Sequence, residues 1–260
     1  IYEFIPIYNN VTFHADKHIA RLNNSLDGIL MENPYTVAQW HTIFKKLLAQ
    51  NTLELSHIYI QVSRGATSVR NHAIPEKITP TVFVAIFPSP SRATFINGMR
   101  IATLLDQRWQ NCRIKATTLL PNVLAKEHAK TNKAQDCIFV NSEGFATEGT
   151  SSNLFIVKDN IVYTTPLSAN ILPGITRSVV INLLKQNNIA LEEKMLTKNE
   201  LVQADEVWLS SSSIEVAPVT MVDGQLIGNG GVGPIWQSID RLFQQHKQAI
   251  VSQQKEMAYD

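Results

Sequence analysis

The sequence has few cysteines, no large excess of positive or negative charge, and no long apolar runs. Its 260 residues include only two cysteines, Cys112 and Cys137, too few for a disulfide framework, so a reducing cytoplasm is the expected location. The formal net charge is +1, and no basic field predicts binding to nucleic acid. The longest apolar runs, such as 81–87, are far too short to cross a bilayer, so no membrane partner is expected. Glu3 and Pro6 interrupt the start of this sequence, so a secretory signal pattern is not expected there.

What the sequence does contain is enough apolar residues, 44% of the chain, for one large or two ordinary domains. Pro88-Ser89-Pro90-Ser91 is the clearest linker. We therefore expect a small N-terminal domain over 1–87, a linker over 88–91 and a larger domain over 92–260. Because the chain begins with Ile1 rather than methionine, we expect that further residues precede it.

Hydrophobic periodicity predicts a mixture of strands and helices. Strands are expected at 1–8, 57–63, 81–87, 99–103, 137–140, 145–147, 153–157, 161–164 and 206–212. Helices are expected after residues 13–16, then at 36–48, 174–187 and 234–250, with a short one opened by the capping box at 197–200. Turn residues such as Asp159-Asn160 and Asp223-Gly224 predict hairpins. Hairpins decorated by helices favour an α+β fold over a doubly wound parallel sheet.

Lys115 is the first candidate for chemistry. It lies where an expected extended run, 109–114, gives way to a helix-like run, 122–133. Apolar Ile114 beside it can hold the amine partly away from water, and such an amine is a better nucleophile toward carbonyls. A lysine at this kind of junction is usually solvated, so the interpretation depends on the segments that follow.

Glu148 is the second candidate, since it stands among small residues between two expected strands, in Ala146-Thr147-Glu148-Gly149-Thr150. A carboxylate in that place can pair with a pyridine nitrogen and keep it protonated, and a protonated ring withdraws electrons from a carbanion. A solvated turn glutamate is the alternative. With Lys115, this acid suggests pyridoxal phosphate as cofactor.

A third set of residues offers a place for a phosphate. Leu172-Pro173-Gly174-Ile175-Thr176-Arg177 opens a helix, whose free N–H groups and dipole favour an anion, although an ordinary helix cap is the alternative. The serines 210–213 supply hydroxyls at a strand end. Arg21, on the first helix, supplies a guanidinium fork, unless it only covers a solvated helix face.

The order and spacing of these motifs resemble the fold-type IV pyridoxal-phosphate enzymes, and among them the D-amino-acid aminotransferases. The resemblance runs along nearly the whole chain, through Ile1-Tyr2-Glu3, His18-Ile19-Ala20-Arg21-Leu22, Gln61-Val62-Ser63-Arg64-Gly65, Ile114-Lys115, Asn122-Val123-Leu124-Ala125-Lys126, Thr147-Glu148-Gly149, Ser152-Asn153, Gly174-Ile175-Thr176-Arg177 and Asp223-Gly224. It implies a two-domain α+β fold, although the strand and turn that the family has before the Tyr-Glu pair are missing here.

The resemblance also implies a role for each site residue. Lys115 would be the Schiff-base lysine and Glu148 the partner of the ring nitrogen. The residues that would hold the phosphate or pack on the ring are Arg21, the backbone of Ile175 and Thr176, Ser211, Ser212 and Leu172.

The substrate residues implied by the resemblance are Tyr2, lining the pocket, and Arg70 with His72, reaching the carboxylate from a neighbouring subunit of a homodimer. A bidentate guanidinium suits a carboxylate, and holding it on one wall selects the hand of the amino acid. D-amino acids such as D-alanine or D-glutamate are therefore the expected substrates, with a 2-oxo acid as acceptor. The alternatives are an L-branched-chain aminotransferase, an aminodeoxychorismate lyase or a scaffold without turnover. No metal site is expected, because His14 and His18 have no apparent third ligand.

Overall fold

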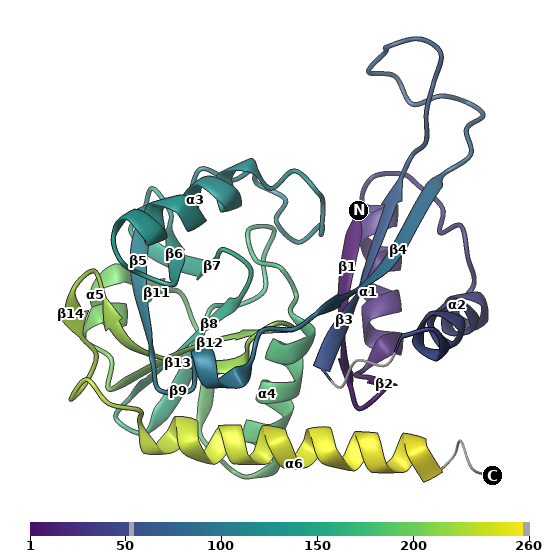
Figure 1. Cartoon of the computed structure of the whole chain (residues 1–260). Coiled ribbons are helices and arrows are strands. Elements are labelled where there is room, and N and C mark those ends of the chain that lie inside the picture. The colour runs from purple at the N-terminus through teal and green to yellow at the C-terminus, as the bar shows by residue number, and fades with distance from the viewer. Residues whose placement is uncertain (52–54, 257–260) are drawn as a thin grey trace. The chain divides into compact units, whose positions relative to one another are not determined.

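The structure is a computed structural model that describes residues 1–51 and 55–256, and it divides into two compact units (Figure 1). The first unit contains Ile1–Ser89 together with Ile114–Thr117, and the second contains Pro90–Arg113 and the chain from Thr118 onward. The division after Ser89 falls inside the linker expected at 88–91. The expectation that everything after residue 91 belongs to the larger domain differs from this division, because the Lys115 segment clusters with the first unit.

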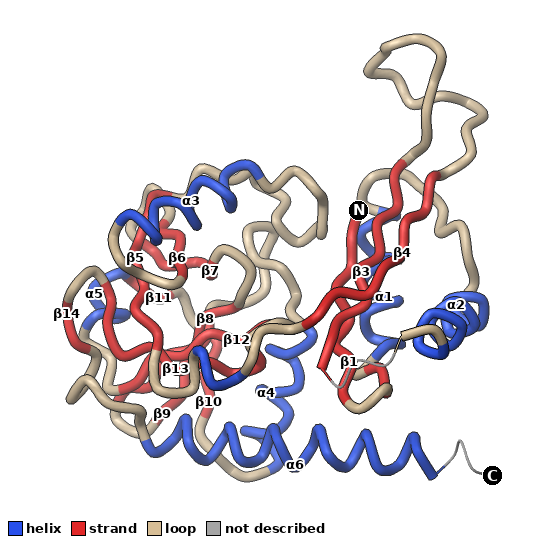
Figure 2. Tube along the Cα trace, in the orientation of Figure 1, coloured by secondary structure: helices blue, strands red, loops and turns tan. Residues whose placement is uncertain are grey.

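The first unit is a four-stranded antiparallel sheet in the order β2-β1-β3-β4, with two helices (Figure 2). Its elements are β1 (Tyr2–Tyr8), β2 (Val11–Thr12), α1 (Ala15–Asp27), α2 (Val37–Ala49), β3 (Leu55–Ser63) and β4 (Thr81–Pro88). Alternation along β3 buries Ile58, Ile60 and Val62 in one core with Leu22 of α1 and Trp40 of α2. Alternate residues of β3 face this core, which confirms the strand predicted at 57–63 from the period of its apolar residues.

Helix α2 begins with a reciprocal capping box. The side chain of Thr36 accepts a hydrogen bond from the backbone N–H of Gln39, and the Gln39 side chain accepts one from the Thr36 N–H. We expect Thr36→Ala to lower the free energy of unfolding by about 1 kcal/mol, measured by urea denaturation. Thr42→Ala is the matched control, because the Thr42 hydroxyl only donates back to the Ala38 carbonyl on the same helix and caps nothing. Equal losses in the two variants would contradict this assignment.

The second unit is built on a ten-stranded mixed sheet. Its strands are β5 (Met99–Leu105), β6 (Asp136–Val140), β7 (Phe145–Gly149), β8 (Asn153–Lys158), β9 (Ile161–Thr164), β10 (Leu191–Glu193), β11 (Leu196–Thr197), β12 (Glu206–Ser211), β13 (Glu215–Val222) and β14 (Gln225–Leu226). The order β8-β12-β13-β5-β6-β7 closes on itself, because β7 also pairs with β8. The closed ring surrounds an apolar core that includes Ile101, Ile138, Leu154, Leu209 and Val219.

The helices of this unit are the 3-10 turn η1 (Arg92–Thr94), α3 (Leu120–Thr131), α4 (Ile175–Gln186), α5 (Lys198–Val202) and α6 (Pro234–Glu256). Small residues of α3, Ala125 and Ala129, pack beside Cys137 and Phe139 of β6. Helix α4 contacts β12 and α6 (Figure 1). Among the described residues, no helix combines the length and the apolar character needed to cross a membrane.

The structure corrects the sequence-based description of the chain before α3. The expected extended run 109–114 contains bends and a turn rather than a strand, and α3 begins at Leu120 rather than at residue 122. Strand pairing stops just after β5, where the N–H of Asp106 donates to the carbonyl of Val140 at 2.7 Å. Side-chain contacts of Asp106 then turn the chain, so Lys115 lies in a loop and not between a strand and a helix. The last helix also extends to Glu256, beyond the expected end at 250.

Candidate active site

Lys115 is held by its backbone in the first unit. Its N–H donates to the hydroxyl of Ser25 at 3.1 Å, and its carbonyl accepts the N–H of Tyr2 at 3.0 Å. The side chain is half-buried, and Nζ lies 4.2 Å from the centre of the Tyr2 ring. Neighbouring Ile114 is buried in the core of the same unit and packs so closely on Gly28 that a Cβ there would lie 2.9 Å from its Cδ1. The position of the amine is therefore fixed by tertiary contacts on both sides.

Arg21 lies in a buried polar cluster of the same unit. Its Nε donates to Glu3 Oε1 at 2.7 Å and its Nη2 to Glu3 Oε2 at 2.8 Å, while His18 Nδ1 lies 2.9 Å from the same Oε2. Burial alone would raise the pKa of Glu3, but the charge and hydrogen bonds of Arg21 and His18 hold it below its usual value. Burial lowers the pKa of His18 despite Glu3. The cluster therefore pairs an ionised Glu3 with Arg21 and keeps the guanidinium in one orientation.

Glu148 is buried near the end of β7 in the second unit. Its Oε1 accepts from Arg108 Nη1, and its Oε2 accepts from Asn153 Nδ2 at 3.2 Å and from the N–H of Leu172 at 3.1 Å. Cross-strand pairing fixes Asn153 here, since it lies opposite Glu148 on one side and opposite Ser210 on the other. The structure thus brings Glu148 and Leu172 together, as the sequence-based site requires, and it holds the carboxylate in a fixed orientation.

The expected phosphate residues also lie in the second unit. Ile175 and Thr176 begin α4 after Gly174, which gives the helix no side-chain cap; its first N–H groups consequently lack intrahelical acceptors. Ser211 and Ser212 lie at the turn from β12 to β13, where the hydroxyl of Ser211 lies 3.1 Å from that of Ser213. These groups are polar donors at element ends, the kind of group that binds phosphate in proteins.

Arg70 and His72 lie in a loop of the first unit. Both are exposed in the long loop that extends from β3 and β4 (Figure 1), and no described residue hydrogen bonds to either side chain. Gly65 at the base of the loop has φ +108°, and a Cβ there would overlap the carbonyl of Thr79. The structure therefore does not bring the expected substrate pair to the other site residues of the first unit.

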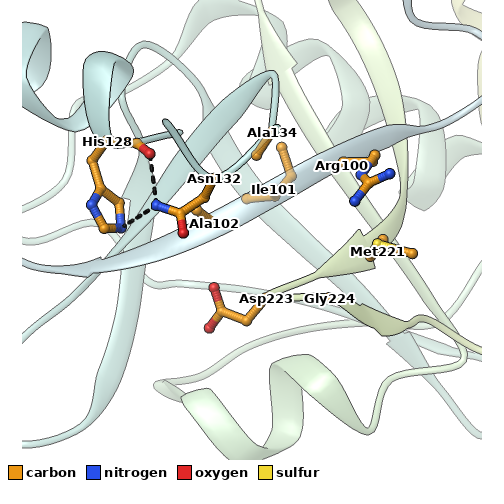
Figure 3. Close-up of a pocket in the computed structure, with 9 residues that line it drawn as sticks. All are labelled: Arg100, Ile101, Ala102, His128, Asn132, Ala134, Met221, Asp223 and Gly224. Atoms are coloured by element: carbon orange, nitrogen blue, oxygen red, sulfur yellow. Dashed lines mark hydrogen bonds between the residues drawn. The ribbon is translucent and has the colours of Figure 1, made fainter. Parts of the chain in front are cut away.

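A separate cavity of about 430 Å³ lies in the second unit, between β5, α3 and the β13–β14 turn. Its lining includes Arg100, His128 and Asp223, and none of the expected site residues (Figure 3). The amide of Asn132 donates to the carbonyl of His128 at 2.8 Å on its wall. This cavity does not carry the candidate chemistry.

With this geometry described, the chain can be compared with known proteins. The family model named amino-transferase class IV matches residues 1–222. The chain belongs to this family. Membership confirms the family resemblance seen in the sequence and the predicted α+β, fold-type IV architecture. It also confirms the predicted aminotransferase activity class and the cofactor, because class IV aminotransferases use pyridoxal 5′-phosphate.

This class IV aminotransferase is similar to one relative by sequence and to two solved structures that differ in their named activities. D-Alanine aminotransferase of Bacillus licheniformis is 39% identical over 246 residues, covering 94% of this chain and 86% of the relative. Branched-chain amino acid aminotransferase of Thermobaculum terrenum, solved in its PLP form, has 25% identity and a TM-score of 0.83 over 94% of this chain and 83% of its own. A putative 4-amino-4-deoxychorismate lyase of Legionella pneumophila has 25% identity and a TM-score of 0.87 over 94% and 90% of the two chains.

Sequence reasoning missed several polar residues of this class IV aminotransferase. Glu3 and His18 were not expected to support Arg21, and Asp106 and Arg108 were not expected to support Glu148. A signal for the second pair was available, since Asp106 and Arg108 come shortly after an expected strand, at 99–103, in a connecting segment of the kind that often carries site residues. The incorrect extended run at 109–114 concealed the turn that brings them inward.

Proposed function

We propose that this chain transfers the amino group of small D-amino acids, such as D-alanine, to a 2-oxo acid such as 2-oxoglutarate, with pyridoxal 5′-phosphate bound. The relatives named D-alanine aminotransferase, 36–39% identical over about 95% of the chain, support this substrate class. The structural observation that carries the proposal is Glu148, a buried carboxylate held by donors from three segments. Such a group is suited to a protonated pyridine nitrogen.

Several residues fit the cofactor. The hydroxyls of Ser152 and Ser210 are buried and have no hydrogen-bond partner among the described residues, so a polar ligand would satisfy them. At Gly174 a Cβ would overlap Asn153 Oδ1, so only glycine leaves room for the backbone there. The start of α4 adds N–H donors for a dianion. We assign phosphate binding to Arg21, to the backbone of Ile175 and Thr176, and to Ser211 and Ser212, with Leu172 packing on the ring.

The proposed chemistry divides between two side chains. When bound, pyridoxal phosphate supplies an aldehyde and an electron-withdrawing ring. Lys115 would hold the cofactor through Nζ, and the same amine, when free, would act as the base and acid that moves the proton at the substrate Cα. General acid–base help of this kind is worth roughly 10²–10⁴-fold. Glu148 keeps the ring nitrogen protonated, and Tyr2, against Lys115 Nζ, lines the substrate side.

The proposed assembly is a homodimer in which Arg70 and His72 serve the neighbouring subunit. Their exposure without a partner among the described residues supports a role outside their own chain. An apolar stripe on α3 supports assembly, since Leu120, Val123 and Leu124 are 69%, 60% and 57% exposed at i, i+3 and i+4 spacing. Such stripes are usually covered. We place the enzyme in the cytoplasm, where the free thiols of Cys112 and Cys137 stay reduced.

Arg70 provides a test of substrate binding. We expect Arg70→Ala to raise the KM for both the amino acid and the 2-oxo acid by about 10²-fold, because a charged partner of a carboxylate is worth roughly 2–5 kcal/mol and each decade is about 1.4 kcal/mol. Steady-state kinetics measures the effect. Lys77→Ala, on the same exposed loop, is the control and should leave both KM values unchanged. An unchanged KM in Arg70→Ala would remove Arg70 from the substrate site.

The proposal is tested directly by adding D-alanine and 2-oxoglutarate to the purified holoenzyme. A shift of the visible cofactor band and formation of D-glutamate are the expected results. Activity with L-leucine but not with D-alanine would identify an L-branched-chain aminotransferase instead. Release of pyruvate from aminodeoxychorismate without an acceptor would identify the lyase, and no turnover in any assay would leave a scaffold.

A further inference from the structure

A polar cluster behind Glu148 has no part in the chemistry described above. Asp106 Oδ1 accepts from the N–H of Arg108 at 3.1 Å and from its Nε at 2.9 Å, while Oδ2 accepts from Arg108 Nη2 at 2.7 Å. Oδ2 also accepts the hydroxyl of Thr147 at 3.0 Å. The remaining terminal nitrogen, Nη1, donates to Glu148 Oε1. Arg108 is therefore bound by Asp106 along one edge and presents the other edge to Glu148.

The members of this cluster have little freedom to move. The side chains of Asp106, Arg108 and Glu148 are 11%, 6% and 6% exposed, and the guanidinium carbon lies 4.4 Å from the centre of the Phe139 ring. Strands β5, β6 and β7 are neighbours in the sheet and supply the residues around it. A guanidinium packed on an aromatic face and bound by a fork keeps a single orientation.

The charges of the cluster bind Arg108 to Asp106. Burial alone would raise the pKa of Asp106, but the hydrogen bonds and charge of Arg108, with the hydroxyl of Thr147, hold it below its usual value, so Asp106 is ionised at neutral pH. Burial disfavours the charge on Arg108, yet Asp106 and Glu148 raise its pKa. Asp106 and Arg108 therefore form a buried ion pair in which each group favours the charged form of the other.

We propose that Asp106 is a positioning residue that holds Arg108 and Thr147 so that Glu148 keeps one orientation toward the protonated nitrogen of an aromatic heterocycle. This inference rests on the proposed function, since it assigns the heterocycle to pyridoxal phosphate. Replacing Asp106 by asparagine removes one negative charge and turns one of the two acceptor oxygens of the fork into a donor. Arg108 would then pair mainly with Glu148, and Glu148 would hold the ring proton less strongly.

The test uses holoenzyme reconstituted with cofactor labelled with 15N in the ring, whose chemical shift reports protonation of that nitrogen. In Asp106→Asn we expect the shift to move toward the unprotonated value and kcat to fall by about 10-fold, within the roughly 10–100-fold range of outer-shell partners. The KM for D-alanine should stay within about twofold, because Asp106 touches no substrate. Thr147→Val, which removes a weaker Asp106 contact, should change the shift in the same direction by less.

A matched control removes a similar ion pair elsewhere in the second unit. Asp240 accepts from Arg92 Nη1 at 2.7 Å and from Nη2 at 2.6 Å, so Asp240→Asn should alter thermal stability without moving the 15N shift or kcat. If Asp106→Asn keeps the parent shift and kcat while Glu148→Gln changes both, the inference about Asp106 is wrong and the proposed function survives. If the parent nitrogen is unprotonated, or Glu148→Gln leaves it unchanged, the role proposed for Glu148 fails. If Asp106→Asn does not fold, Thr147→Val decides alone, and a parent shift in that variant overturns the inference.

Discussion

Lys115→Ala should reduce transamination by roughly 10⁴-fold or more, because the variant loses the side chain proposed both to anchor the cofactor covalently and to move the Cα proton. The structure indicates that the variant will fold. The hydrogen bonds that fix this segment to Ser25 and Tyr2 use only the backbone of residue 115. We expect the visible cofactor band of the parent enzyme to be absent or displaced. After borohydride reduction and digestion, mass spectrometry should detect no peptide that carries the cofactor.

Lys130→Ala is the control for this experiment, because the Lys130 side chain is 79% exposed on α3 and forms a surface pair with Glu127. It should keep the band, the covalent attachment and the rate. If Lys115→Ala retained the parent band and a reducible attachment, another amine would be the anchor, and the assignment of Lys115 would be wrong.

Glu148→Gln should lower kcat by roughly 10²–10³-fold, the usual cost of removing one preorganised electrostatic group. Glutamine has the same shape and can still accept from Arg108, but it carries no charge to hold a proton on the ring nitrogen. Its amide NH₂ would also face Asn153 Nδ2 and the N–H of Leu172, which are both donors. Arg108 remains paired with Asp106, so the variant does not strand a buried cation, and the loss in kcat should exceed the loss of stability from the two donors that face the amide.

Glu143→Gln is the matched control, since Glu143 is an exposed glutamate in the turn between β6 and β7, close in sequence to Glu148. It should leave the rate and the cofactor spectrum unchanged. Stopped-flow half-reactions with D-alanine measure the chemical step apart from product release. A Glu148→Gln variant with the parent rate would show that the ring nitrogen needs no carboxylate here.

Much of the fold could be predicted from the sequence because local patterns decide it. Alternation in β3 and β4, the two capping boxes at Thr36 and Thr197, and the hairpin residues Asp159 and Asn160, both with positive φ, act over a few residues. The closed ring β8-β12-β13-β5-β6-β7 could not be predicted. It depends on the pairing of β7 with β8 and on the parallel pairing of β5 with β6 and β13, which no local pattern in the sequence specifies.

The candidate site was predictable in part for the same reason. Lys115, Glu148 and the start of α4 were found from the family resemblance together with residue chemistry. Their supporting groups were not, since Glu3 reaches Arg21 across 18 positions and Arg108 reaches Glu148 across 40. No periodicity in a single sequence reports which buried charge will compensate another.

The return of residues 114–117 to the first unit has a consequence for how this protein can be made and dissected. The chain passes between the units three times, so no single cut yields both of them whole. A fragment ending at Ser89 would lack Ile114 and Ala116, which pack in its core. During synthesis on the ribosome, that core would stay incomplete until at least residue 117 had emerged, so the step that completes it also places Lys115, the proposed cofactor anchor.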